Sequence, residues 1–557
     1  MRVLLMMLLS SNLLIGQDNS IQQIQQSQSV RKQYIDKSIG NKNFHSTSKS
    51  LFVDPFIGTG GHGHTYPGAS APFGMIQLSP DTRHDGWDGC SGYHFSDSVI
   101  YGFSHTHLSG VGVPDYCDLL IVPQSGKART TPGYIDKTNG FGSRFSHLEE
   151  KAAPGYYEVK LKDENINVRL TTSERAGIHE YTFLNKEDKK YILIDLDHRD
   201  QLLDQSIDFQ SDKKTISGYR ISNAWATNQH FYFYLNLSAP FVKAKRIEKN
   251  GQHKLLLTFS ASTEKLLIRV GISAVDIEGA KMNVNKEIPD FDFNAVRSSV
   301  SRKWNEELGK IDFQSTDKSV MTNFYTALYH TFLQPNLFSD IDGRYRGRDN
   351  AIHLITDNIP QYTVFSLWDT YRGTHPLYTI VQQKRTNEFI ETFLRQFEQG
   401  KDLPVWELAG NETECMIGYH SVSVIADAYV KGLRDFNAKF ALEAMKTTSQ
   451  IDELGKTQFH ENGFISSGDE PESVSKTLEY AYDDFCIATM AKSLNQDIDF
   501  QKYSKSAFNF LNLYDPSSKF MRARRGGLWY SPFEPSEVNF NYTEANSWQY
   551  SLYAPHA

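Results

Sequence analysis

A change in the spacing of apolar residues constrains the fold of this chain more than any other feature. Between about residues 156 and 273, apolar and polar residues alternate in short segments, namely 157–161, 191–196, 231–235 and 266–270. Short alternating segments separated by polar turns predict an antiparallel β-sandwich. After about residue 290 the apolar residues recur with helical spacing instead. A run of strands followed by a run of helices predicts two domains in series, an α+β multidomain chain.

The helical spacing is clearest in the segments 296–308, 319–333, 386–399, 421–436, 473–494 and 500–513. A chain of 557 residues has room for two or more domains at about 100–200 residues per domain. We therefore expect a sandwich domain over residues 51–290, a linker helix over 291–315 and a helical domain over 316–557.

The N-terminus resembles a secretory signal. Met1 and Arg2 precede a short apolar stretch that Ser10, Ser11 and Asn12 interrupt, so the stretch is too short to span a membrane. We expect a signal peptide over residues 1–17, a flexible lead-in over 18–50, and a mature chain that is secreted or periplasmic and has no transmembrane anchor.

Charge and cysteine content exclude several functions. The formal net charge is -8 and no long block carries a single sign, so we expect no nucleic acid among the partners. The four cysteines are scattered, without the CxxC spacing of zinc or thiol redox sites, and one disulfide, Cys90–Cys117, remains open.

Glycine and histidine dominate residues 53–69, which predicts a shaped loop. His62 and His64, like His105 and His107, lie two residues apart and could hold a metal. We favour turn and packing roles for these histidines, because no third ligand is indicated. A phosphate-binding role is disfavoured, because no GKS or GKT follows the glycines.

Three further segments carry groups suited to sugar chemistry. Trp87 lies between glycines and carboxylates and is either an exposed platform or buried under its own loop. Asp369 and Arg372 are three residues apart, close enough to pair on one helical face. Glu544 lies among aromatic and amide residues, which could desolvate its carboxyl group and raise its pKa, as a general acid requires. Residues 404–420 add three glutamates and a histidine, each a weak candidate alone.

Taken together, these segments closely resemble the family 92 glycoside hydrolases, which are calcium-dependent, inverting exo-α-mannosidases. The resemblance extends from about residue 51 to residue 557. The most specific strings are DPFIGTGGHGHTYPGASAPFGMIQLSPD (54–81), GWDGCSGYH (86–94), GFSHTHLSGVG (102–112), FSLWDTYR (365–372), LPVWELAGNETECMIGYHSV (403–422) and YTEANSWQY (542–550).

The resemblance implies a β-sandwich packed on an α/α toroid of six helical hairpins, with Ca²⁺ as cofactor. It also implies hydrolysis of terminal α-mannosides, most often α-1,2-linked, in N-glycans or mannan. By motif, Glu544 corresponds to the general acid, and Trp87 and Asp369 correspond to groups that bind the terminal mannose. Arg372 is a further substrate-binding candidate by position in the same motifs, and Asn546 and Gln549, beside the acid, are candidates for contact with the sugar or the calcium shell.

The C-terminal end departs from the family pattern. Family members continue beyond the position of Ala557 with further hairpins, a calcium and substrate segment, and a loop that carries the general base. We therefore expect an incomplete toroid, with most calcium ligands and the base beyond Ala557, so the metal ligands stay unassigned. The alternative function is an inactive truncated fragment or pseudoenzyme that at most binds mannosides. A structural sandwich protein without a carbohydrate role is disfavoured by the motifs.

Overall fold

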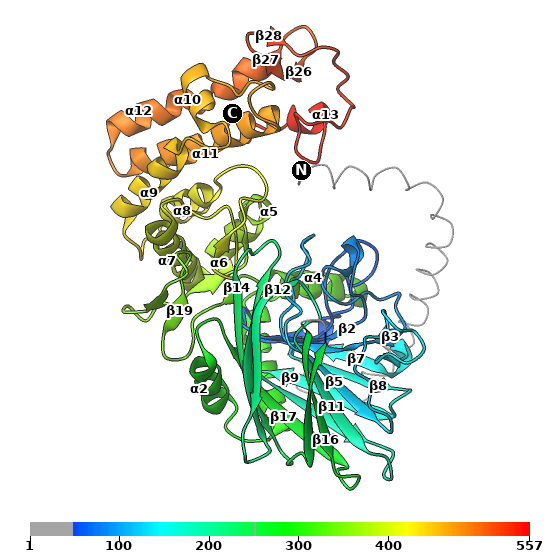
Figure 1. Ribbon diagram of the computed structural model, residues 1–557. Helices are drawn as coiled ribbons and strands as arrows, with labels where there is room; N and C mark the ends of the chain where they lie inside the picture. The colour runs from blue at the N-terminus through cyan, green and yellow to red at the C-terminus, as the bar shows by residue number, and fades with distance from the viewer. Residues whose placement is uncertain (1–47, 250–251) are drawn as a thin grey trace. The chain divides into compact units, whose positions relative to one another are not determined.

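A computed structural model describes residues 48–249 and 252–557 (Figure 1). The chain divides into two units, Met1–Lys49 and Ser50–Ala557. The predicted signal peptide (1–17) and nearly all of the lead-in (18–50) lie outside the described residues. Everything below concerns the second unit, which holds both the strands and the helices.

Antiparallel strands form two large sheets in the first half of this unit. The seven-stranded sheet has the order β1 (Ala69–Ser70), β2 (Gln77–Asp81), β4 (Gly102–Ser104), β5 (Leu120–Ser125), β11 (Lys190–Asp195), β16 (Gln252–Phe259) and β15 (Lys243–Lys249). The eight-stranded sheet has the order β12 (Gln201–Phe209), β13 (Thr215–Asn223), β14 (Gln229–Leu237), β17 (Lys265–Ser273), β10 (Ala176–Phe183), β9 (Ile166–Thr172), β8 (Tyr156–Leu161) and β7 (Glu150–Ala153).

The alternation in the sequence produces these strands directly. In β14, Phe231, Phe233, Leu235 and Leu237 are buried and the residues between them are only partly buried. One face of the strand therefore joins the core while the other stays near solvent. The strands predicted from alternation are all present, within β8, β11, β14 and β17.

Helices make up most of the second half (Figure 1). They are α2 (Ile277–Glu287), α3 (Phe293–Leu308), α4 (Lys318–Thr331), α5 (Leu367–Thr370), α6 (Thr374–Val381), α7 (Gln383–Gly400), α8 (Ser421–Val430), α9 (Ala438–Gln450), α10 (Lys456–Asn462), α11 (Ser473–Ser493), α12 (Asp497–Ser506) and α13 (Ser547–Tyr550). Side-chain caps begin several of them: Asp276, Asp292 and Asp317 each accept a hydrogen bond from a backbone N–H of the first turn.

Short strand pairs interrupt the helical half, and the sequence did not predict them. They are β18 (Asn336–Leu337) with β21 (Tyr362–Thr363), β19 (Arg344–Arg346) with β20 (Ile352–Leu354), β22 (Phe365–Ser366) with β23 (Trp406–Leu408) and β24 (Asn411–Glu412), β25 (Tyr514–Asp515) with β26 (Phe520–Met521), and β27 (Arg524–Arg525) with β28 (Leu528–Trp529). A further pair, β3 (Val99–Ile100) with β6 (Ser143–Arg144), lies in the strand half. Runs of two or three residues are too short to show a period in the sequence.

The strand and helical halves share backbone hydrogen bonds. The N–H of Phe73 donates to Phe332 O at 2.8 Å, and the N–H of Leu337 donates to Phe73 O at 2.8 Å. The buried indole of Trp304 in α3 donates to Ser70 O in β1 at 2.7 Å. These bonds fix the loops that begin the helical half against the first strands of the sandwich. The predicted boundaries at residues 290 and 315 stay predictions, because the contacts hold both halves in one unit.

Among the described residues, no helix combines the length and the apolar character needed to cross a bilayer.

Candidate active site

The loop that carries Glu544 is held by the N-terminus of helix α11. The N–H of Glu472, just before this helix, donates to Phe540 O at 2.6 Å, and the N–H of Val474 donates to Asn541 O at 3.1 Å. Ser475 Oγ in turn accepts from the N–H of Thr543 at 2.8 Å. The first N–H groups of a helix have no partner within the helix, so carbonyls of the loop satisfy them here. The position of Glu544 is therefore set by a helix rather than by a free loop.

Glu544 is exposed and has a strained backbone, with φ at +49°. A left-handed conformation costs a residue with a Cβ about 1–2 kcal/mol. Non-glycine residues with positive φ recur in the neighbouring loops, at Val364 (+67°), Glu414 (+50°), Met416 (+70°) and Glu472 (+60°). Such strain persists only where the surrounding structure imposes it, and it gathers at functional sites.

The carboxyl group of Glu544 holds its proton more tightly than an ordinary glutamate. Partial desolvation raises its pKa, and the negative charges of Asp369 and Glu472 raise it further. Burial, together with the negative charges of Glu544, Asp369, Glu412 and Glu472, raises the pKa of the Cys415 thiol to about 12. The structure thus brings Asp369 and Glu544 into one acidic cluster. A carboxyl that stays protonated near neutral pH can act as a general acid.

The predicted pairing of Asp369 with Arg372 is wrong. Helix α5 ends at Thr370, so the two residues do not share a helical face. Asp369 accepts a short hydrogen bond from Ser366 Oγ. The guanidinium of Arg372 instead pairs with the buried Glu479 of α11 at 3.2 Å and lies 4.8 Å from the ring centroid of Tyr371.

Asn546 and Gln549 cap a helix, a role that the sequence did not predict. Asn546 Oδ1 accepts from the N–H groups of Trp548 at 3.1 Å and Gln549 at 3.4 Å, and Gln549 Oε1 accepts from the N–H of Asn546 at 3.0 Å. This reciprocal pair is a capping box that begins α13. The three-residue spacing of Asn and Gln is a signal that could have identified it.

Trp87 is an exposed platform, as one of the two interpretations predicted. It begins the short turn Trp87–Gly89, and 55% of the residue is exposed. The ring of His64 meets the indole edge to face at 4.3 Å between centroids, and that of His62 lies at 5.2 Å. Asp88 Oδ1 accepts from both histidines, at 2.7 Å from His62 Nδ1 and 3.4 Å from His64 Nε2.

An apolar cluster connects the loops of the sandwich with those of the helical half. Leu108 and Val113, which flank the glycine-rich turn near Trp87, pack in it with Trp406 and Leu408. Cys415 and Met416 pack against the same cluster, and Cys415 adjoins the acidic cluster described above. The apolar cluster therefore joins the glycine-rich turn near Trp87 to the loop of Cys415, whose thiol the charge of Glu544 affects.

The glutamates of residues 404–420 hold their own loop together. Glu407 is fully buried, and its Oε1 accepts from Gly410 N at 2.7 Å and Thr363 Oγ1 at 2.9 Å. Glu412 accepts from the backbone N–H groups of Val405 and Trp406, both at 2.9 Å. These bonds favour the structural interpretation of the two carboxylates.

His420 lies in a buried ion pair, between Asp483 at 2.8 Å and Glu479 at 3.1 Å. Burial lowers its pKa, but the two carboxylates outweigh burial and raise the pKa to about 9. His420 is therefore protonated at neutral pH, and it neutralises part of the charge on the carboxylate that binds Arg372.

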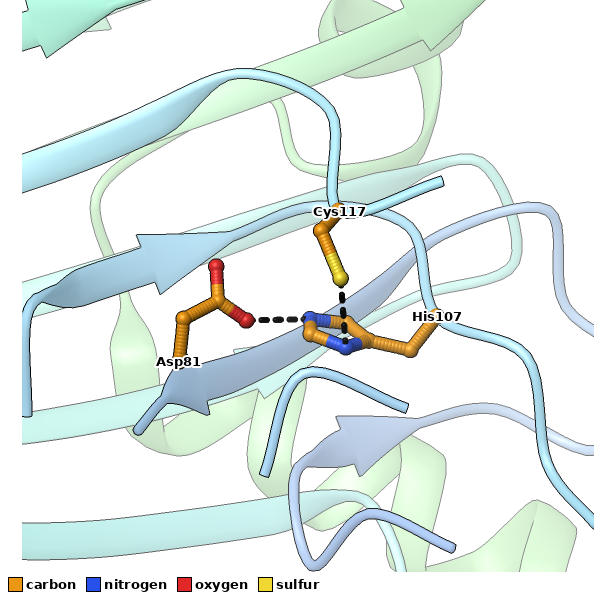
Figure 2. A group of neighbouring side chains, drawn as sticks. All are labelled: Asp81, His107 and Cys117. Carbon is orange, nitrogen blue, oxygen red and sulfur yellow. Dashed lines mark hydrogen bonds and ion pairs between the residues drawn. The ribbon is translucent and has the colours of Figure 1, made fainter. Parts of the chain in front are cut away.

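A second cluster lies inside the sandwich, where Asp81, His107 and Cys117 converge (Figure 2). The atoms that could bind a metal lie within 4.8 Å of one another. Both ring nitrogens of His107 already have hydrogen-bond partners: Nδ1 with Ser91 O at 2.9 Å and Nε2 with Ser104 Oγ at 2.9 Å. His107 is therefore satisfied without a metal, which favours the packing interpretation of this histidine.

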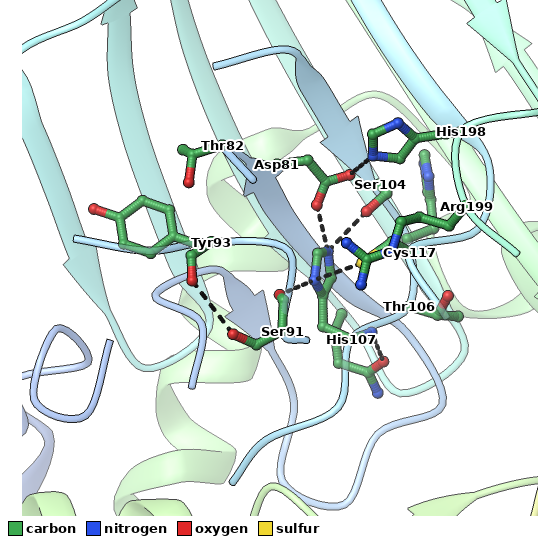
Figure 3. A network of polar contacts seen from close by, with 12 residues as sticks. Asp81, Thr82, Ser91, Tyr93, Ser104, Thr106, His107, Cys117, His198 and Arg199 are labelled. Carbon is green, nitrogen blue, oxygen red and sulfur yellow. Dashed lines mark hydrogen bonds and ion pairs between the residues drawn. The ribbon is translucent and has the colours of Figure 1, made fainter. Parts of the chain in front are cut away.

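The surrounding network includes Ser91, His198 and Arg199 (Figure 3). Asp81 Oδ2 lies 2.9 Å from His198 Nε2. Burial alone would raise the pKa of Asp81, but the hydrogen bond and charge of His198, with the charge of His107, hold it below its usual value. His105, the remaining candidate, bonds Leu119 O at 2.6 Å and His179 Nε2 at 3.1 Å. All four cysteines are free.

A cavity of about 430 Å³ lies between helices α6, α8 and α11. Tyr371, Arg372, Tyr482 and Tyr553 line it, whereas Asp369 and Glu544 do not.

Comparison with known proteins identifies the family. The model of the glycosyl hydrolase family 92 N-terminal domain matches residues 52–273, and that of the family 92 catalytic domain matches residues 279–557. The chain belongs to glycosyl hydrolase family 92. The family resemblance inferred from the motifs is thereby confirmed, as is a fold of sandwich sheets followed by a helical domain.

Solved family 92 structures agree with this assignment. A family GH92 α-mannosidase from Bacteroides thetaiotaomicron is 37% identical with a TM-score of 0.87, and covers 91% of this chain and 71% of its own. A family GH92 inverting mannosidase from the same organism is 28% identical with a TM-score of 0.83 and the same coverage. An uncharacterized secreted glycosidase from Arthroderma benhamiae is 24% identical over 518 residues. This chain spans 62% of the length of that curated relative and 83% of its own.

Sequence reasoning missed Glu472, Glu479 and the His420 ion pair. Glu472 and Glu479 lie at the start and within α11, where a carboxylate in a helix looks like an ordinary solvated residue. Glu479 is fully buried. The signal was present in the apolar spacing around Leu478, because a charged residue on the apolar face of a helix must be paired.

Proposed function

We propose that this family 92 protein is an exo-acting α-mannosidase, a glycoside hydrolase that removes terminal mannose from α-mannose-containing glycans. The proposal extends to α-1,2 linkages in N-glycans or mannan, to inversion of configuration and to dependence on Ca²⁺. Family membership and the likeness to two Bacteroides thetaiotaomicron mannosidases support it. A structure of the first of these in complex with mannoimidazole also matches this chain, with 36% identity.

The observation that carries the proposal is the setting of Glu544. Glu544 is exposed, its loop is held by α11 in a left-handed backbone conformation, and partial burial and the neighbouring carboxylates raise its pKa above the usual value for glutamate. Cleavage of a glycosidic bond needs a proton on the leaving oxygen, and a carboxylic acid with a raised pKa supplies it at neutral pH. Glu544 is the general acid in this proposal, and Asp369 binds the terminal sugar beside it.

Inversion requires a second carboxylate that activates water on the opposite face of the sugar, about 6.5–9.5 Å from the acid. The name of the second mannosidase, an inverting enzyme, supports inversion here. We assign no general base among the described residues, because Asp369 and Glu472 are already explained by their effect on Glu544.

Calcium dependence rests on the family resemblance. Ca²⁺ prefers six to eight oxygen ligands. Among the described residues, the group of convergent candidate ligands is Asp81, His107 and Cys117, where a thiol and an imidazole do not suit a hard cation. The carboxylates around Glu544 supply oxygen atoms but form no such convergent group. The residues in this structure do not fit a calcium cage, and no step is assigned to the ion.

We also propose that the mature protein is secreted or periplasmic. The charged start and short apolar stretch of residues 1–17 support this location, as does the secreted relative from Arthroderma benhamiae.

The experiment uses the purified full-length protein with α-1,2-, α-1,3- and α-1,6-linked mannobiose, and follows released mannose by proton NMR from the first minutes. The proposal predicts that mannose is released, that the β anomer appears first, and that the α-1,2 linkage is cleaved fastest. EDTA should abolish turnover, and added Ca²⁺ should restore it. Release of the α anomer first would refute inversion, activity unchanged by EDTA would refute calcium dependence, and no release from any disaccharide would refute the function.

A further inference from the structure

The sugar platform at Trp87 is built by residues that have no assigned role. The indole is exposed on one side, yet its turn is only three residues long. Something outside the turn must therefore fix the ring. Two contacts, from His64 and Gly112, and one indirect link through Arg199 do so.

The first contact is the ring of His64, which meets the indole edge to face. His64 is buried, with φ at +51°, and Nδ1 bonds Val111 O at 3.1 Å while Nε2 faces Asp88 Oδ1 at 3.4 Å. The ring is thus held at both nitrogens. An edge-to-face contact with a fixed ring restricts the tilt of the indole.

The second contact is the backbone at Gly112. A Cβ added at this glycine would lie 2.8 Å from Nε1 of Trp87, closer than Cβ atoms approach a neighbouring heavy atom. The backbone at Gly112 therefore packs against the indole on the side of its nitrogen and limits its movement in that direction. Its backbone conformation is not left-handed, so the close approach to Trp87 is what requires glycine here.

The third contact is indirect and comes from Arg199, drawn beside His107 in Figure 3. The buried guanidinium donates to His84 O at 3.0 Å and Gly89 O at 3.2 Å on the loop of Trp87, and to Pro114 O at 3.1 Å on the loop of Gly112. Arg199 therefore ties the loop that carries the indole to the loop of Gly112, which touches the indole. A buried guanidinium needs such partners, which makes this link rigid.

We propose that His64 and Gly112 are positioning residues that set the place of the Trp87 indole, and thereby the affinity for the terminal sugar rather than the rate of bond cleavage. The inference rests on the proposed function, because it takes Trp87 as the surface on which the sugar stacks. Neither residue donates a proton or a charge to the reaction, so both act through Trp87 alone.

The test compares Gly112→Ala with Gly60→Ala, a matched control whose added Cβ would meet Phe95 Cβ at an ordinary 3.6 Å. Loss of an aligned stacking contact weakens binding by about tenfold, so KM for α-1,2-mannobiose should rise about tenfold in Gly112→Ala while kcat stays within threefold. Gly60→Ala should match the wild type. His64→Asn, in which asparagine tolerates the left-handed backbone, should raise KM in the same way.

Unchanged KM in both variants, or a fall in kcat with KM unchanged, would overturn the inference. The activity of the wild type distinguishes a failure of this inference from a failure of the proposed function. If the wild type releases no mannose, the proposed function fails. In that case the quenching of tryptophan fluorescence is used to measure the binding of mannose. Binding at least fivefold weaker in Gly112→Ala than in Gly60→Ala would sustain the positioning role, and equal or absent binding would overturn it.

Discussion

Gly92 offers a quantitative test of the buried network in the sandwich. Its φ is +79°, and a Cβ added there would lie 2.4 Å from Asp81 Oδ1, 2.9 Å from Cys117 Sγ and 3.1 Å from His107 Cε1. Gly92→Ala therefore carries two costs. The left-handed backbone costs about 1–2 kcal/mol, and overpacking of a dense core costs about 1–3 kcal/mol. The expected destabilisation is about 2–5 kcal/mol.

Gly110→Ala separates the two costs. Gly110 has a similar φ of +75°, but an added Cβ would meet nothing within 4 Å. Gly110→Ala should lower the free energy of unfolding only by the cost of the left-handed backbone, about 1–2 kcal/mol. The difference between the two variants then measures the steric share, because the loss of chain flexibility in the unfolded state is the same for both substitutions.

The assay is thermal unfolding of both variants and the wild type by scanning fluorimetry. At about 2.1 cal/mol/K per residue, a unit of about 500 residues unfolds with an entropy of about 1 kcal/mol/K, so each kcal/mol lowers Tm by about 1 °C. We expect Tm to fall by about 2–5 °C in Gly92→Ala and about 1–2 °C in Gly110→Ala. Equal losses would refute the claim that Asp81, His107 and Cys117 are packed rigidly against Gly92.

Three further predictions concern charge. Burial raises the pKa of Glu407 from 4.5 to about 7, so the native state loses stability as pH rises from 4.5 to 7. Glu407→Gln should therefore stabilise the protein by up to about 3 kcal/mol at pH 8 and not near pH 4.5. Denaturation of the variant and the wild type at both pH values measures this difference. His420→Asn leaves the buried Asp483 without its cation and leaves Glu479 with Arg372 alone, so it should cost about 3–5 kcal/mol, seen as a far larger drop in Tm than for the more exposed His353→Asn. Glu472→Gln removes a charge that raises the pKa of Glu544, so the alkaline limb of kcat/KM should move to lower pH; an unmoved limb would contradict the assignment of Glu544.

The sequence predicted the helices and strands in which apolar residues recur at a regular spacing, and it missed the elements without such a spacing. Strand β14 and helix α11 show clear periods, and both were predicted close to their ends. Strand β2 was missed, because all five of its residues are buried, including Gln77 and Asp81, so the sequence shows no alternation. Buried polar strands of this kind depend on tertiary partners such as His198, which lies far away in the chain.

The roles of the candidate site residues stay predictions, and the structure describes only how these residues are arranged. Motif resemblance pointed to Glu544 and Asp369, and the structure brings them together. The three-residue spacing of Asp369 and Arg372 suggested a pair that the early end of α5 prevents. Neither the left-handed backbone of Glu544 nor the exposure of Trp87 leaves a mark in the sequence, because both depend on how loops pack.

The most direct test of the central claim, that Glu544 is the general acid of an α-mannosidase, compares leaving groups. Wild type, Glu544→Gln and the exposed control Glu534→Gln are each assayed on α-1,2-mannobiose and on 2,4-dinitrophenyl α-mannoside, whose leaving group departs without protonation. Loss of a general acid costs about 10²–10⁴ in rate, so Glu544→Gln should lose that factor on the disaccharide and far less on the activated mannoside, while Glu534→Gln stays at wild-type rates. Equal losses on both substrates, or wild-type rates in Glu544→Gln, would contradict the claim.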